Sequence, residues 1–198
     1  MRTRMRFGIL AGAALTVAIT VLSLGSTATA APAVAGHPVA NATATMPGPG
    51  VPTTSPSLPP FYHYLVNRQY GQCMYAPGVL NGGLQLATCT YSLKEQWSFQ
   101  QVNIYSEPGK PNIYRIRNRE SGLCVFVNNT GPGGRVREGY CTTAANVQWE
   151  LWPSSVSGSY LFVNVSTRLA LDTAGGRFSQ LAQWPPAGNY AQLWYLYL

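Results

Sequence analysis

A threefold internal repeat constrains the fold of this chain more than any other feature of its sequence. Three tryptophans each lie eight residues after a matching position, and the pairs are Cys89 and Trp97, Cys141 and Trp149, and Pro186 and Trp194. Sixteen or seventeen residues before those matching positions stand Cys73, Cys124 and Ala170. A repeated unit of this size cannot bury its apolar face alone, so we expect the three copies to close on one shared core.

Each copy carries the signals of about four short strands. A tyrosine opens an alternating segment in every copy, at Tyr64, Tyr114 and Tyr160, and glycine-rich turns follow it. The chain contains 20 Gly and 15 Pro but only 10% charged residues, a composition that disfavours long solvated helices. We therefore predict an all-β fold of twelve strands, in copies that cover about 61–109, 110–155 and 156–198.

The four cysteines predict two disulfides within copies. The third copy lacks a cysteine at both of its matching positions, Ala170 and Pro186. Because the loss of one partner alone would leave a free thiol, this paired loss predicts that the bonds join the residues Cys73 with Cys89 and Cys124 with Cys141. A zinc site is disfavoured, since there is no Cys-x-x-Cys and the folded part holds one histidine, His63. We expect no metal and no cofactor.

The first 60 residues carry no signal of a packed core. Residues 1–30 have the organisation of a secretory signal, with a positive start, an apolar run from Phe7 to Leu24 and the small-residue pattern Ala28-Thr29-Ala30. An uncleaved anchor is the alternative, because the apolar run approaches the roughly 18 residues that span a bilayer. Residues 31–60 hold eight prolines and no charged or aromatic residue, which predicts a disordered tether. We expect a secreted, extracellular monomer that folds over 61–198 and has no membrane segment in its mature form.

The repeated pattern of Tyr, Asn, Ser-Gly-x-Cys, Gly-Gly and Cys, ending in Gln-x-Trp, resembles the ricin B-chain-type lectin family. The third copy has the full Gln192-Leu193-Trp194, whereas the other copies displace the glutamine, as Glu95-Gln96-Trp97 and Val147-Gln148-Trp149. The resemblance covers residues 61–198. It implies a β-trefoil of three four-stranded subdomains related by pseudo-threefold symmetry, and it implies carbohydrate binding.

Sugar pockets of that family use three positions in a copy. An Asp stands two residues after the first cysteine position, an aromatic residue stands two before the second, and the Gln of Gln-x-Trp supports the Asp. A carboxylate accepts hydrogen bonds from adjacent hydroxyls, and an aromatic face covers the apolar face of a sugar ring. The first copy has Tyr75 and Ala87 at the first two positions, and the second has Phe126 and Gly139. Neither copy can therefore both accept hydrogen bonds with a carboxylate and cover the sugar ring with an aromatic face.

The third copy carries the full set, and the resemblance assigns it the sugar site. Asp172 would orient the hydroxyls, Trp184 would stack on the ring, and Gln192 would hold the carboxylate. We expect the side chains of Asp172 and Trp184 at the surface. Ala182 and Ala191 replace polar contacts of the family, and Asn189 is a candidate to compensate. The implied ligand is a galactose-type sugar or a repetitive polysaccharide, while the alternative for Asp172 is a residue that caps a turn.

A second hypothesis rests on arginines of the second copy, which would bind an anionic polymer through their guanidinium forks. Alternating positions place them on one face of a strand and of a nearby segment. The candidates are Arg115, Arg117, Arg119, Arg135 and Arg137. The alternative is a solvated strand face that is partly balanced by Glu120 and Glu138. A third hypothesis is a protein-binding trefoil of the protease-inhibitor kind, although no loop stands out by length.

Nucleic-acid binding and catalysis have little support. The formal net charge of +7 includes three arginines of the leader, and the remainder is only mildly basic. A nucleophilic triad would depend on His63 with Asp172, and there is no Gly-x-Ser-x-Gly elbow. The glutamates scatter over the three copies, which disfavours a two-carboxylate glycosidase. We expect a protein that is not an enzyme.

Overall fold

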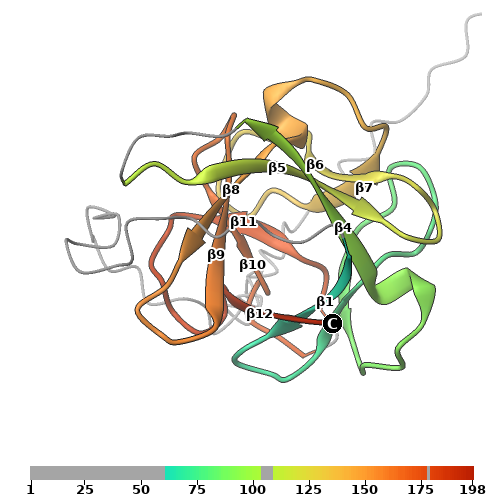
Figure 1. The fold of residues 1–198 in the computed structure, drawn as a ribbon, viewed down its shortest axis with the longest axis horizontal. Coiled ribbons are helices and arrows are strands. Elements are labelled where there is room, and N and C mark those ends of the chain that lie inside the picture. The colour runs from blue at the N-terminus through green and yellow to red at the C-terminus, as the bar shows by residue number, and fades with distance from the viewer. Residues whose placement is uncertain (1–60, 104–108, 178) are drawn as a thin grey trace, which may run out of the picture. The chain divides into compact units, whose positions relative to one another are not determined.

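Twelve antiparallel strands in three groups of four make up the folded part of the chain (Figure 1). A computed structural model describes residues 61–198 except 104–108 and 178, so the predicted signal and tether lie outside the described residues. The described part of the chain contains no helix with the length and hydropathy needed to cross a bilayer.

Each copy contributes four strands. The first copy comprises β1 (Tyr62–Asn67), β2 (Cys73–Tyr75), β3 (Gln85–Ala87) and β4 (Gln96–Asn103). The second comprises β5 (Asn112–Asn118), β6 (Cys124–Val127), β7 (Val136–Gly139) and β8 (Trp149–Pro153). The third comprises β9 (Ser159–Asn164), β10 (Ala170–Asp172), β11 (Ala182–Trp184) and β12 (Leu193–Tyr197). Short 3₁₀ turns, η1 (Leu93–Glu95) and η2 (Ala145–Val147), precede β4 and β8.

The first and last strands of the copies form a closed barrel in the order β1, β4, β5, β8, β9 and β12, because β12 pairs back to β1. The remaining strands form three hairpins, β2–β3, β6–β7 and β10–β11. These hairpins meet one another through isolated bridges, which join Gly83 to Arg137, Gln85 to Gln180 and Arg135 to Ala182. A barrel closed in this way, with hairpins at one end, is a β-trefoil, and closure removes exposed sheet edges.

The tryptophans that revealed the repeat are core residues in all three copies. Each is at most 1% exposed, and its indole N–H donates to a main-chain carbonyl of the same copy. The three bonds run from Trp97 to Met74, from Trp149 to Val125 and from Trp194 to Leu171. The equivalent partners confirm the sequence alignment of the copies.

A buried asparagine at the end of β1, β5 and β9 ties each copy to the preceding one. The Nδ2 groups of Asn67, Asn118 and Asn164 donate to the carbonyls of Ala191, Lys94 and Asn146, at 2.9 to 3.0 Å. Each Oδ1 accepts from the two N–H groups of the turn that follows. The first copy is thereby bonded to the third, so the connections between copies also form a closed ring.

Both predicted disulfides are confirmed. Cys73 is bonded to Cys89 and Cys124 to Cys141, each across one hairpin of its own copy. In the third copy, Ala170 and Pro186 take the corresponding places without a covalent link.

Candidate functional site

The structure buries the carboxylate that the sequence assigned to the third-copy site. Asp172 ends β10 and is 0% exposed, and its Oδ1 accepts a hydrogen bond from the N–H of Ala174 at 2.8 Å. The expectation that this side chain lies at the surface is therefore wrong. The contact is that of a turn-capping side chain, which was the alternative interpretation, and Ala174 lies in the turn with a positive φ of 50°.

Gln192 is also buried, and its side chain holds a loop in place through hydrogen bonds. Its Oε1 accepts from the N–H groups of Ala187 and Gly188 at 2.7 and 3.2 Å, while its Nε2 donates to the carbonyl of Pro185 at 2.9 Å. Both ends of the amide are thus used on the backbone after β11, in place of the predicted support for Asp172.

The same position in the first copy has the same role, which sequence reasoning missed. Glu95 is 1% exposed, and its carboxylate accepts from the N–H and the hydroxyl of Thr90, both at 2.9 Å. Thr90 and Ala187 each follow the second cysteine position of their copy. The first residue of the Gln-x-Trp segment therefore closes the adjacent loop in two of the three copies.

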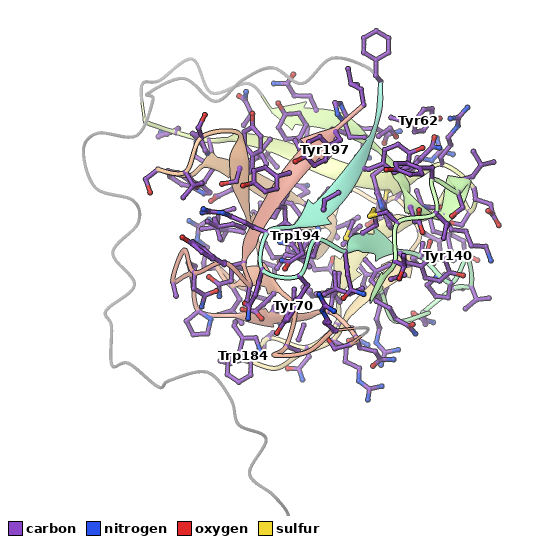
Figure 2. The ribbon with its side chains drawn as sticks, turned by 90° about the horizontal axis from the view of Figure 1, so that it is seen from below. Tyr62, Tyr70, Tyr140, Trp184, Trp194 and Tyr197 are labelled. Atoms are coloured by element: carbon purple, nitrogen blue, oxygen red, sulfur yellow. A yellow bond between two sulfur atoms is a disulfide. The ribbon has the colours of Figure 1, made fainter. Side chains whose placement is uncertain are left out.

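The other two predicted third-copy residues are accessible. Trp184 ends β11, is half-buried and lies at the rim of the folded domain in Figure 2. It also approaches the second copy, because a Cβ on Gly133 would be 3.7 Å from its ring. Asn189 is exposed, and its carbonyl accepts from the N–H of Gln192. The four residues do not form one open site in this conformation.

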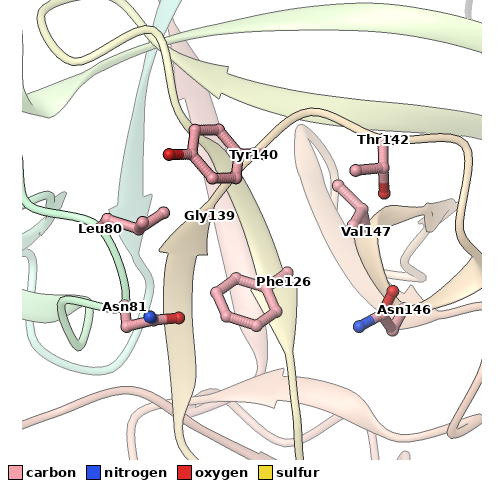
Figure 3. Close-up of a pocket in the computed structure, with 8 residues that line it drawn as sticks. All are labelled: Leu80, Asn81, Phe126, Gly139, Tyr140, Thr142, Asn146 and Val147. Atoms are coloured by element: carbon pink, nitrogen blue, oxygen red, sulfur yellow. The ribbon is translucent and has the colours of Figure 1, made fainter.

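A pocket of about 270 Å³ opens in the second copy instead (Figure 3). Its walls come from the loop after β2, from the β6–β7 hairpin and from the segment before β8. The lining residues are Leu80, Asn81, Phe126, Gly139, Tyr140, Thr142, Asn146 and Val147. Three of them, Phe126, Gly139 and Val147, occupy the second copy's equivalents of the three family positions.

Glycine at position 139 makes room for the phenyl ring in this pocket. A Cβ there would come within 2.8 Å of two ring carbons of Phe126, so any larger residue would displace the ring. The next residue, Tyr140, is 69% exposed and supplies a second aromatic side chain at the pocket wall. Sequence reasoning set this copy aside because Phe126 and Gly139 supply neither the carboxylate nor the aromatic residue of the family positions, whereas an aromatic group stands one residue after Gly139.

Two amides, of Asn81 and Asn146, and two hydroxyls, of Tyr140 and Thr142, give the pocket its polar groups. The Nδ2 of Asn146 donates to the carbonyl of Val127 at 2.9 Å, which fixes the side chain. The backbone of Asn81 is held by β7, because its N–H donates to the carbonyl of Glu138 and its carbonyl accepts from Arg137 at 2.7 Å. Amide groups and apolar walls can orient a small neutral molecule, and none of the lining residues carries a charge.

The five arginines fall into two groups. Arg115 and Arg117 point outward from β5, and Arg119 follows that strand. Arg135 and Arg137 belong to the β6–β7 hairpin, where both form bridges to neighbouring hairpins. The alternation predicted for β5 is confirmed by its burial pattern, although Arg119 lies in the turn beyond the strand.

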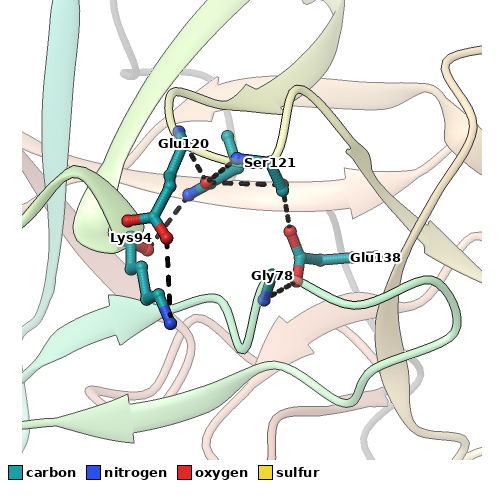
Figure 4. A network of polar contacts seen from close by, with 6 residues as sticks. Gly78, Lys94, Glu120, Ser121 and Glu138 are labelled. Carbon is teal, nitrogen blue, oxygen red and sulfur yellow. Dashed lines mark hydrogen bonds and ion pairs between the residues drawn. The ribbon is translucent and has the colours of Figure 1, made fainter.

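Glu120 and Glu138, the residues expected to balance these arginines in part, have other direct partners. Glu138 is 0% exposed and accepts from the hydroxyl of Ser121 at 2.6 Å and from the N–H of Gly78 at 2.8 Å (Figure 4). Glu120 pairs with Lys94 at 3.8 Å. The two carboxylates thus hold the first and second copies together and leave the arginines without their predicted partners.

Comparison with known proteins gives a family and a set of similar folds. A model of the ricin-type β-trefoil lectin domain-like family matches residues 93–177 and 145–197. No curated protein matches the sequence. The designed threefold-symmetric protein ThreeFoil has a TM-score of 0.60 and 21% identity, over 69% of this chain and 98% of the designed one.

Two further solved structures show a similar likeness. SeviL bound to asialo-GM1 saccharide has a TM-score of 0.53 and 20% identity, over 70% of this chain and 98% of SeviL. An exo-β-1,3-galactanase from Clostridium thermocellum has a TM-score of 0.61 and 21% identity, but the match covers 73% of this chain and only 31% of that one. These structures share the trefoil fold with the present chain.

Proposed function

Because the chain belongs to the ricin-type β-trefoil lectin-like family, we propose that it is a carbohydrate-binding protein without catalytic activity. We further propose that it is exported, that its mature form is a monomer, and that its ligand is a galactose-type sugar or a repetitive polysaccharide. The leader at 1–30 supports export, and the disulfides Cys73–Cys89 and Cys124–Cys141 fit an oxidising compartment.

The pocket of the second copy is the sugar site in this proposal. The observation that carries it is the place of the pocket, since all three family positions of the copy line it. Phe126 and Tyr140 offer ring faces to the apolar side of a sugar, and Asn81, Asn146 and Thr142 offer partners for its hydroxyls. A pocket of this size accepts one ring at a time.

The chemistry of the pocket differs from that of the family pattern, and this difference has consequences for affinity. Phe126 stands where the family has a carboxylate, so the charge-assisted hydrogen bonds to sugar hydroxyls are lost. Binding therefore depends on ring stacking and neutral hydrogen bonds, which are modest in water. The interaction should be weak for one site, insensitive to salt, and useful on a polymer that presents many equal units.

The third copy is the second candidate. Trp184 and Asn189 are accessible there, but a sugar could reach Asp172 only if the turn that follows it moved. Binding at this place would follow the family pattern more closely and would use a carboxylate.

The test is binding of the full chain to immobilised galactan, with dextran as a second neutral polymer, at low and high salt. Tyr140→Ala should lower galactan binding at least about tenfold, the loss of about 1.4 kcal/mol that removal of one stacked ring can cause. Phe61→Ala is the matched control, because Phe61 is also exposed, at 57%, and lies outside the pocket.

Trp184→Ala separates the two copies. Full binding in Trp184→Ala together with loss in Tyr140→Ala assigns the sugar to the second copy. The opposite result assigns it to the third. Equal binding by every variant would contradict the proposed site. Release of soluble sugar from galactan during the assay would contradict the proposed lack of catalysis.

A further inference from the structure

A second surface, on the outside of the barrel, carries tyrosines on two strands and arginines at a third. In one row across the sheet, Tyr197 of β12 lies opposite Tyr64 of β1, which lies opposite Gln96 of β4. The N–H of Arg119 donates to the carbonyl of Gln96 and continues the row. In the next row, Tyr62 lies opposite Ser98, which lies opposite Arg117 of β5. Residues opposite one another share a face of the sheet, so these side chains form one surface.

The tyrosines are exposed and held in place. Tyr62 is 42% exposed and Tyr197 is 52% exposed, and Figure 2 shows both on the same side of the molecule. Tyr64 is fixed by Gln96, whose Nε2 donates to its hydroxyl at 2.6 Å. Its ring meets the edge of Tyr91, which is 71% exposed, at 5.3 Å between centroids. Exposed aromatic rings that are already ordered lose little entropy when a ligand stacks on them.

The arginines lie at the other end of the same rows. The guanidinium carbon of Arg119 is 4.6 Å from the ring centroid of Tyr62, a cation–π contact that places a positive charge beside the aromatic surface. Arg117 is exposed, and its Nε donates to the carbonyl of Gly122 at 2.9 Å, which orients the guanidinium group. From β12 to β5 the surface spans three strand intervals, about 14 Å.

No carboxylate of the described residues pairs with Arg117 or Arg119. Two glutamates of the described residues pair with other cations, Glu120 with Lys94 and Glu150 with Arg168. The surface therefore combines an aromatic platform with positive charges that lack an internal counter-ion.

We propose that this tyrosine–arginine face binds an acidic polysaccharide, with sugar rings stacked on the tyrosines and carboxylate or sulfate groups held by Arg117 and Arg119. The rings complement the apolar face of a sugar, and the guanidinium fork complements a planar oxyanion. The proposal is independent of the pocket of the second copy, which holds neither of these arginines and has uncharged walls.

The chemistry favours an acidic glycan over a nucleic acid as the partner. Only two arginines face the ligand here, whereas nucleic-acid grooves follow the phosphate backbone with many positive charges. The tyrosines of β1 and β12 lie side by side on the outside of the barrel, which suits successive rings of an extended chain.

The test uses the full chain and three soluble probes, which are polygalacturonate, neutral dextran and a thymidine oligonucleotide. Affinity electrophoresis or sedimentation measures binding at 20 mM and 500 mM salt, conditions chosen because the Debye length falls below about 10 Å above 0.1 M salt. We expect polygalacturonate binding that weakens with salt and exceeds binding of the other two probes. Arg117→Gln with Arg119→Gln should weaken it at least about tenfold, as expected for loss of hydrogen bonds to charged groups.

Two more variants complete the design. Tyr62→Ala should weaken polygalacturonate binding about tenfold through loss of stacking. Arg177→Gln is the matched charge control, because Arg177 is an exposed arginine of the third copy that lies outside these rows. If Arg177→Gln lost as much polygalacturonate binding as the Arg117 and Arg119 variant, the loss would come from net charge alone, and the proposal would be overturned.

The remaining outcomes separate this face from other sites. A loss in Tyr140→Ala as large as in the arginine variant would assign the polymer to the pocket and overturn the proposal. Tighter binding of the oligonucleotide, with the same dependence on Arg117 and Arg119, would replace the acidic glycan by a nucleic acid. If galactan binding fails while polygalacturonate binding follows the arginines, the pocket proposal is wrong and this one holds.

Discussion

Replacing Asn118 by alanine removes one of the three side chains that link each copy to its neighbour. Asn118 is 2% exposed. Its Nδ2 donates to the carbonyls of Lys94 and Gln96 at 3.0 and 3.4 Å, and its Oδ1 accepts from the N–H groups of Glu120 and Ser121 at 3.0 and 3.1 Å. The hydroxyl of Ser121 also donates to Oδ1, at 3.4 Å, so the substitution deletes five bonds without adding a group.

The expected loss in the free energy of unfolding depends on which hydrogen bonds the former partners of Asn118 retain. The carbonyls of Lys94 and Gln96 each retain one bond, from the N–H groups of Ala76 and Arg119. The N–H groups of the turn lose their acceptor, but water can reach that turn because Glu120 is exposed. At about 1 kcal/mol for each hydrogen bond, and with partial replacement by water, we expect Asn118→Ala to lower the free energy of unfolding by about 3 kcal/mol.

The assay is urea unfolding followed by tryptophan fluorescence, with both disulfides intact. Asn128→Ala is the matched control, since Asn128 is exposed, and it should change the free energy of unfolding by less than about 0.5 kcal/mol. Asn118→Asp keeps the size of the side chain but turns an oxygen toward two carbonyls, so it should destabilise at least as much as Asn118→Ala. A value for Asn118→Ala within about 0.5 kcal/mol of the wild type would refute the role given to this side chain.

Three further predictions follow from the hairpins. Gly139→Ala should push the ring of Phe126 into the pocket and abolish galactan binding while circular dichroism shows a folded protein; unaltered binding would mean that the ring does not form the pocket wall. Reduction of both disulfides should lower the free energy of unfolding by about 3 kcal/mol for each bond by the loop-entropy model, and a change below about 1 kcal/mol in total would contradict that estimate. Asp172→Ala should cost about 1 kcal/mol through loss of the turn cap on Ala174, and wild-type stability in urea would argue against that cap.

The fold could be predicted because its determinants recur at fixed spacing. The distance from each second cysteine position to Trp97, Trp149 or Trp194 is the same in all three copies, and these side chains fill equivalent places in the core. The disulfides followed from the same alignment. Periodic features of this kind depend on strand geometry, which sequence spacing reflects directly.

The site could be predicted only in part, because it depends on loops. The sequence allowed Asp172 to be either a sugar ligand or a turn cap without deciding between them, and nothing in it indicates that Gln192 bonds to the backbone of residues 185–188. The pocket was missed because Phe126 replaces the family's carboxylate and because its aromatic wall, Tyr140, is shifted by one residue from the family position. Such features arise from loop conformations whose hydrogen-bond partners are distant in sequence. Glu138 illustrates this, since its partner Gly78 is 60 residues away.

The pairing of β1 with β12 has a consequence for how the chain can be rearranged. Tyr64 lies opposite Tyr197, so the first and last strands of the barrel run side by side. Because the asparagine contacts join each copy to the one before it, including the first to the third, the folded structure does not require a particular copy to come first. A short linker from Leu198 to Phe61, with new ends opened in the connection between β8 and β9, should therefore yield a circularly permuted chain that builds the same barrel. The folded barrel would then be the same whichever of the three copies came first in the sequence.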